Sequence, residues 1–148
     1  MPKSFTCPIL DVSHLLSQSG KMIQVDQVLE YGDDFIVTSF EIKPDNIFLE
    51  NDQLDIIYAI EHMAQSIGCW AGCQTLAHGE KVNIGYFLGS RNIQLATNAL
   101  KVGTKLLTKV KLSIQDASGF GVFDVEMYDA QTQVLLAQAS LNVFSPNN

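Results

Sequence analysis

The sequence predicts an α+β fold in which an antiparallel sheet wraps around one long central helix. Two segments with alternating apolar and polar residues come first, at 22–29 and 35–42. A proline-free stretch at 54–78 then carries apolar residues at helical spacing. Only strand-like segments follow it, at 82–88, 92–95, 104–114, 120–129 and 134–144. Because strands and helices do not alternate along the chain, we expect an antiparallel sheet and no parallel βαβ unit.

Turn-forming residues mark where the expected strands end. Gly32-Asp33-Asp34 separates the first two strands, which we expect to pair as a hairpin. Residues 8–16 before them are expected to form a short helix or turn, and Pro44-Asp45-Asn46 after them opens an irregular loop. Turn signals separate the later strands at 101–103, 116–119 and 129–131.

The expected helix carries a stripe rich in small residues, which would let a sheet or a second helix approach its backbone closely. The stripe consists of Ile57, Glu61, Ala64, Gly68, Ala71 and Thr75, with Ile60 and Ile67 beside it. Asp52 or Asp55 near the start complements the helix dipole, and Gly79 is placed to cap the end. These features suit a helix enclosed by a curved sheet.

Length and composition indicate one folded domain spanning residues 1–148. The chain is 47% hydrophobic and 17% charged, a balance typical of globular proteins. Its net charge of −7 disfavours non-specific nucleic-acid binding, which requires clustered basic residues. Neither a signal peptide nor a membrane span is apparent, so we expect a cytoplasmic protein.

The cysteines indicate neither a disulfide framework nor a metal site. Their number, three, is odd. Cys69 and Cys73 lie four residues apart, which stacks two side chains on one helix face, but no second pair accompanies them. We therefore expect no metal and no cofactor.

Basic residues gather in one part of this acidic chain. They are Arg91, Lys101, Lys105, Lys109 and Lys111. Such a cluster can attract an acidic partner. The alternative is a solvated strand face that keeps a sheet edge soluble.

Glu61 is the most distinctive candidate for chemistry. The sequence contains no phosphate-binding loop, nucleophile elbow or His-Glu-x-x-His pair. Glu61, by contrast, falls within the apolar stripe, where burial of a carboxylate is costly and raises its pKa. Gln65 lies one helical turn further and can orient the carboxylate by a hydrogen bond. The alternative is that Glu61 turns toward solvent at the edge of the stripe.

The chain resembles a known family in several segments. Glu61-His62-Met63-Ala64-Gln65 is similar to the Glu-Ala-Met-Ala-Gln signature on the central helix of 3-hydroxyacyl-acyl carrier protein dehydratases, which have the hotdog fold. Further segments resemble the branch associated with aryl polyene biosynthesis: 19–22, 25–28, 85–91 and 141–144. The resemblance covers residues from about 10 to 145.

The resemblance implies a homodimer with an acyl tunnel at its interface. In such dehydratases a histidine before the helix removes the C2 proton of the thioester, and the helix carboxylate helps the 3-hydroxyl leave as water. A backbone N–H near the helix start polarises the thioester carbonyl. Glu61 matches the carboxylate and Gln65 its neighbour. Gln65, Ile57 and Gly68 are therefore expected to contact the substrate.

The chain departs from the family where the histidine should be. The family's loop has the form Gly-His-Phe-Pro-Gly, and the corresponding residues 45–50 contain no histidine. In the aryl polyene branch a histidine is also expected just before Ser19, and Gln18 occupies that place. Asn46 and Gln18, which occupy these places, are expected to bind substrate.

Three histidines occur elsewhere. His62 adjoins Glu61 but points about 100° further round the helix, and it is the best remaining base. His14 could fold over the mouth of the site, while His78 lies too far along the helix. For each of them an ordinary capping or surface role is the alternative.

Three functions follow from these observations. The first is dehydration of 3-hydroxyacyl thioesters held on acyl carrier protein, with Glu61 as acid and His62 as base. The second is a hotdog thioesterase that uses the same carboxylate. The third is a non-catalytic acyl-binding partner subunit that has lost the base. In the first and third, the carrier protein is expected to dock on Arg91, Lys101, Lys105 and Lys109.

Overall fold

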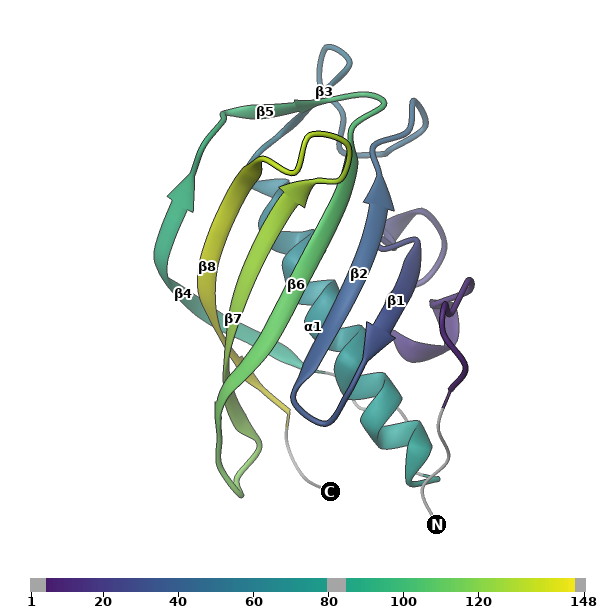
Figure 1. Cartoon of the computed structure of the whole chain (residues 1–148), viewed down its shortest axis with the longest axis vertical. Coiled ribbons are helices and arrows are strands. Elements are labelled where there is room, and N and C mark those ends of the chain that lie inside the picture. Colours follow the sequence, from purple (N-terminus) through teal and green to yellow (C-terminus); the bar gives the residue numbers. More distant parts are fainter. Residues whose placement is uncertain (1–4, 80–84, 146–148) are drawn as a thin grey trace.

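The computed structural model, which describes residues 5–79 and 85–145, contains a curved six-stranded sheet that wraps around one long helix (Figure 1). The strands lie in the order β1-β2-β6-β7-β8-β4, and all neighbours are antiparallel. Their bounds are β1 (Gln27–Tyr31), β2 (Phe35–Glu41), β4 (Tyr86–Leu95), β6 (Lys105–Gln115), β7 (Phe120–Asp129) and β8 (Leu135–Phe144). The helix is α1 (Tyr58–Ala77). The predicted α+β class and antiparallel sheet are confirmed.

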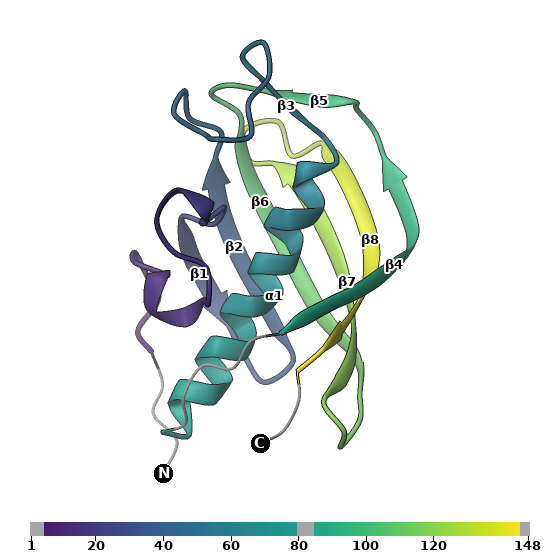
Figure 2. The same ribbon diagram turned by 180° about the vertical axis from the view of Figure 1, so that it is seen from behind.

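Smaller elements lie at the start of the helix and along one side of it. Strands β3 (Gln53–Asp55) and β5 (Ala99–Lys101) form a separate two-stranded sheet that the sequence pattern did not predict, because three residues are too few to show alternation. The N-terminal segment contains two short 3-10 helices, Ser13–Leu15 and Gly20–Met22. Figure 2 shows this segment beside α1 and β1, and Ile9 pairs with Val28 of β1.

Two strands, β1 and β4, differ from their predicted bounds by more than one residue at an end. The first begins at Gln27, because Gly20–Met22 forms a short helix and Gln24 turns into the interior. β4 is one strand where two were expected. Its pairing with β8 shifts register twice, and the backbone of Asn92 has a φ of 54°, so its alternation is interrupted. Of the expected strand at 82–88, residues 82–84 lie outside the described part of the chain.

The packed face of α1 is not the predicted stripe. The buried residues are Ala59, His62, Met63, Gln65, Ser66, Ile67, Cys69, Trp70, Gly72 and Cys73. Stripe residues are half-buried or exposed, and Ile57 at the helix start is 66% exposed. The larger side chains fill the concave face of the sheet, which leaves the small residues on the open side. Among the described residues, no helix is long and apolar enough to cross a membrane.

Only the C-terminal end of the helix is capped as the sequence predicts. Gly79 has a φ of 74°, and its N–H bonds to the carbonyl of Leu76, so it caps the C-terminus as predicted. At the other end, Asp52 and Asp55 were expected only to complement the helix dipole, and no side chain caps the helix there. Asp55 instead accepts a hydrogen bond from the backbone N–H of Ile57, just before the first turn.

His62 lies in the core between α1 and the sheet. Its side chain is 1% exposed and stacks on Phe40 with ring centroids 5.5 Å apart. Nδ1 lies 2.6 Å from the carbonyl oxygen of Gln24, and Nε2 lies 2.7 Å from the hydroxyl of Thr108. Because a carbonyl can only accept, Nδ1 carries the proton and Thr108 donates to Nε2. Burial lowers the pKa of His62 to about 4, against opposing effects of the Gln24 carbonyl and Asp26.

Acid should destabilise the fold through His62. Its folded pKa of about 4 lies below the ordinary value of 6.5, so the unfolded state binds more protons between these values. The contribution is complete above pH 6.5 and falls as pH approaches 4, by about 3 kcal/mol in total. Urea unfolding of the wild type and of His62→Gln across this range measures the difference. Parallel pH dependences of the two proteins would contradict the assignment.

Candidate active site

Glu61 lies in a groove on the open side of α1. The groove has a volume of about 140 Å³ and lies between the N-terminal segment, the helix and the ends of β4 and β8. Leu15, Leu16 and Phe87 give it apolar walls, and Gln18 and Gln65 add polar groups. Among the residues that the structure describes, Glu61 is the only titratable side chain in its lining.

Gln65 holds the Glu61 carboxylate with a side-chain amide whose nitrogen and oxygen both form hydrogen bonds. Its Nε2 donates to Oε1 of Glu61 and to the carbonyl of Met22, both at 2.9 Å. Its Oε1 accepts from the backbone N–H of Gln24 at 2.6 Å. Because the side chain is 1% exposed and meets both donors and acceptors, its amide orientation is fixed. The carboxylate is thus held at one oxygen by a rigid donor.

Gln24 connects this pair to the rest of the core. Its backbone N–H bonds to Gln65 and its carbonyl to His62, one helical turn apart on α1. Its side-chain oxygen accepts from Nδ2 of Asn46 at 2.9 Å, and Asn46 in turn accepts from the N–H of Phe48. The loop after β2 is therefore tied through Gln24 to the residue that orients Glu61. The sequence pattern missed Gln24, because a polar residue in an alternating segment is expected to face solvent.

The structure brings some of the predicted site residues together and separates others. Gln18, Glu61, Gln65 and Gly68 line the groove. Asn46 lies in a neighbouring hollow with Gln24, and Ile57 is exposed at the helix start. Asn46 and Ile57 thus lie outside the groove lining, and their positions give no support to the predicted contacts with a substrate bound there.

None of the three histidines lines the groove. Both ring nitrogens of His62 are engaged in the core, so it cannot meet a substrate in this arrangement, and the expectation that it acts as base does not fit its position. His14 is exposed near Phe5, with ring centroids 6.2 Å apart. His78 is exposed at the end of α1. Among the side chains of residues 5–79 and 85–145, the groove thus offers one titratable proton-transfer group, the Glu61 carboxylate.

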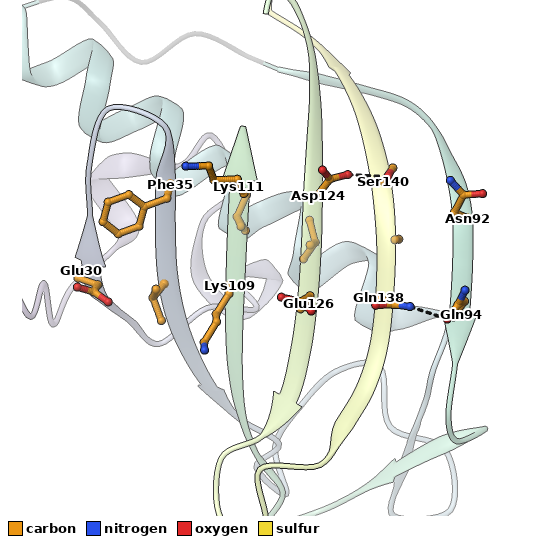
Figure 3. A pocket seen from close by; sticks show the side chains of 14 residues that line it. Glu30, Phe35, Asn92, Gln94, Lys109, Lys111, Asp124, Glu126, Gln138 and Ser140 are labelled. Atoms are coloured by element: carbon orange, nitrogen blue, oxygen red, sulfur yellow. Dashed lines mark hydrogen bonds between the residues drawn. The ribbon is translucent and has the colours of Figure 1, made fainter. Parts of the chain in front are cut away.

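Three lysines of the basic cluster, Lys105, Lys109 and Lys111 of β6, lie on the outer face of the six-stranded sheet, away from α1, where acidic residues balance them. Lys109 is paired across strands with Glu126, and Lys105 with Glu41. Lys111 is paired with Asp124, and its Nζ lies 2.6 Å from Oδ2 of Asp34. This face carries a hollow of about 520 Å³. Figure 3 shows Lys109 and Lys111 of β6 beside Glu126 and Asp124 of β7 in its lining.

The remaining basic residues of the predicted docking site lie elsewhere in the fold. Arg91 is opposite Ser140, and Lys101 is opposite Gln53 at the far end of the molecule. Lysines that face acidic residues on an exposed sheet face fit the alternative interpretation of the basic cluster, a solvated strand face. The assignment of Arg91, Lys101, Lys105 and Lys109 to carrier-protein docking stays a prediction.

Comparison with known proteins places these features in a family. Residues 10–148 match the family described as ApeP-like, ApeP dehydratase. The solved dehydratase heterocomplex ApeI:P from Xenorhabdus doucetiae matches with a TM-score of 0.86 and 28% identity, over 97% of this chain and 94% of that chain. No curated protein matches the sequence.

More distant structures share the fold alone. A hypothetical thioesterase with coenzyme A from Streptococcus pneumoniae TIGR4 has a TM-score of 0.62 and 17% identity, over 80% of this chain and 86% of that one. The Escherichia coli PaaI protein from the phenylacetic acid degradation operon has a TM-score of 0.59 and 12% identity, over 85% and 80%. These neighbours support the hotdog fold that the resemblance implied. With the family match covering nearly the whole sequence, the chain belongs to the ApeP-like family of dehydratases.

Proposed function

We propose that this chain is the carboxylate-bearing subunit of a dehydratase that acts on 3-hydroxyacyl thioesters held on acyl carrier protein. The observation that carries the proposal is the Glu61–Gln65 pair in its apolar-walled groove. Membership of the ApeP-like family supports the reaction class, and the aryl polyene pathway is the setting that this family indicates. Neither a metal nor a cofactor is required for the elimination.

The reaction needs two proton-transfer groups. A base removes the proton from C2, the C2–C3 double bond forms, and the C3–O bond breaks. The hydroxyl leaves as water with a proton that we assign to Glu61. Because Gln65 donates to Oε1 of Glu61, we assign the transferred proton to the other carboxylate oxygen. Proton transfer from the base to the carboxylate, directly or through water, restores both groups.

The base is proposed to come from a second, different subunit. The groove contains one titratable side chain among the described residues, and none of the chain's histidines reaches it. The related ApeI:P dehydratase is a heterocomplex. A partner subunit of the ApeI type that lines the open side of the groove can supply the missing histidine. The homodimer that the resemblance implies is the competing assembly.

A second candidate function is a non-catalytic acyl-binding subunit. The observation that favours it is the same shortage of a base in the groove. Here the partner would carry a complete site of its own, and Glu61 would contribute only to binding. The two functions differ in whether turnover depends on the Glu61 carboxylate.

Replacing Glu61 with Gln should abolish dehydration. The amide keeps the size and the contact with Gln65 but cannot deliver a proton, so turnover should fall by about 100-fold or more. Mass spectrometry of a 3-hydroxyacyl carrier protein, incubated with this chain and its ApeI-type partner, measures the loss of water. Glu30→Gln, the same exchange at an exposed position of β1, is the control. Activity within a few-fold of wild type would show that Glu61 is not the acid, and release of the acyl group would indicate a thioesterase.

Activity should also depend on assembly. The described part of the chain places no second titratable group beside Glu61 in the groove, so we expect dehydration only after an ApeI-type subunit is added, with the two proteins eluting together in size-exclusion chromatography. The matched measurement is turnover by the partner alone, by this chain alone and by the mixture. A chain that dehydrates the substrate by itself as fast as the mixture would contradict a divided site.

A further inference from the structure

One wall of the Glu61 groove is formed by the segment between Leu16 and Met22, and both ends of this segment are fixed to α1. At one end, Leu16 packs on Gly68, where a Cβ would lie 3.0 Å from Cδ2 of the leucine. At the other end, the carbonyl of Met22 accepts a hydrogen bond from Nε2 of Gln65. Because Gly68 and Gln65 are three residues apart on the helix, the segment crosses α1 close to the turn that follows Glu61.

Gln18 belongs to this wall and has a free side-chain amide. It lines the groove together with Glu61 and is half-buried. Among the residues that the structure describes, none forms a hydrogen bond with the side chain of Gln18. The amide therefore has two N–H donors and a carbonyl acceptor available to a ligand in the groove.

The second amide in the groove lining has no donor left. Both N–H groups of Gln65 are engaged, one by a main-chain carbonyl and the other by Oε1 of Glu61. Two serine hydroxyls also line the groove, that of Ser17, which is exposed, and that of Ser145 at the end of β8. Within the described part of the lining, Gln18 is thus the one side-chain amide that can donate to a ligand.

The start of α1 is not placed to donate to a ligand in the groove. The family resemblance implies that a backbone N–H near the helix start polarises the thioester carbonyl. In this chain the N–H groups of Ala59 and Ile60 donate to main-chain carbonyls of the preceding turn, and that of Ile57 donates to Asp55. Moreover, the part of α1 that lines the groove begins only at Glu61. The carbonyl of a substrate in the groove therefore needs another donor.

Elimination of water from a thioester depends on such a donor. When a base removes the C2 proton, the electron pair of the C–H bond moves toward the carbonyl, and negative charge develops on the carbonyl oxygen. The pair then forms the C2–C3 double bond while the C3–O bond breaks and the hydroxyl takes the proton of Glu61. A hydrogen bond to the carbonyl oxygen stabilises the developing charge, and one donor of this kind contributes about 100- to 1,000-fold to turnover.

We propose that the side-chain amide of Gln18 donates a hydrogen bond to the thioester carbonyl of the substrate and so acts as a catalytic residue. This inference rests on the proposed function, because it takes the reacting end of the substrate to lie between Gln18 and Glu61. The two walls of the groove then have different tasks. The helix carboxylate protonates the leaving hydroxyl, and the N-terminal segment polarises the carbonyl.

Infrared spectroscopy of a bound thioester tests the contact without any reaction. The probe is butanoyl pantetheine with carbon-13 at the carbonyl, which has no 3-hydroxyl to lose. Bound to the full chain, its carbonyl band should lie at lower wavenumber than in Gln18→Met, which has a side chain of similar length without a donor. Calorimetry should give affinities within about tenfold of each other, which shows that the variant is folded. Gln131→Met, the same exchange in the exposed β7–β8 turn, should keep the wild-type band.

Turnover provides a second readout. In the complex with an ApeI-type partner, Gln18→Met should lower kcat for the loss of water by about 100-fold, because the donor acts on charge that develops in the transition state. KM should change by less than about tenfold. A rise in KM with kcat unchanged would show that Gln18 only binds the substrate, and would overturn its catalytic role.

The outcomes separate this inference from the proposed function. The same carbonyl band in the wild type and in Gln18→Met, or no binding of the probe to the wild type, would overturn the contact. An unchanged band would assign the carbonyl to a different donor of the groove, such as a backbone N–H. A band that depends on Gln18, in a chain whose complex removes no water from a 3-hydroxyacyl carrier protein, would instead contradict the dehydratase function and leave the contact with the carbonyl in place.

Discussion

The amide of Gln65 is the contact on which the site depends. It joins the Glu61 carboxylate to two backbone groups of the N-terminal segment, the carbonyl of Met22 and the N–H of Gln24. A buried amide with a missing partner is costly, so the segment and the helix must stay in register for all three bonds to form. The position of the catalytic candidate is thereby tied to the folding of a segment about forty residues earlier in the chain.

The same constraint explains why the core around α1 contains polar groups. His62 holds the carbonyl of Gln24 while Gln65 holds its N–H, so two helix side chains fix one residue of the N-terminal segment. A histidine kept neutral by burial can do this without burying a charge. His62 thus supports the site from behind, and the open face of the helix is left to Glu61 and its groove.

The sequence predicted the order of the main elements, the hairpin of β1 and β2 and the contact between Glu61 and Gln65, because each depends on local spacing. It did not predict which face of α1 is packed. Glycine and alanine allow a sheet to approach the helix closely, but they can equally line an open groove. Which of the two occurs depends on which side chains fill the interior of the sheet. Nor could spacing show that the lysines of β6 face acids on β7, or that Gln24 turns inward, since both depend on pairing between distant segments.

The central claim is that Glu61 supplies one half of a site completed by another subunit. The most direct test is a structure of this chain with its ApeI-type partner and a bound pantetheine amide. The account predicts a histidine of the partner beside C2 of the acyl group, on the opposite side from Glu61. A partner seated on the outer face of the sheet, with the groove open to solvent and no second proton-transfer group near the ligand, would contradict it.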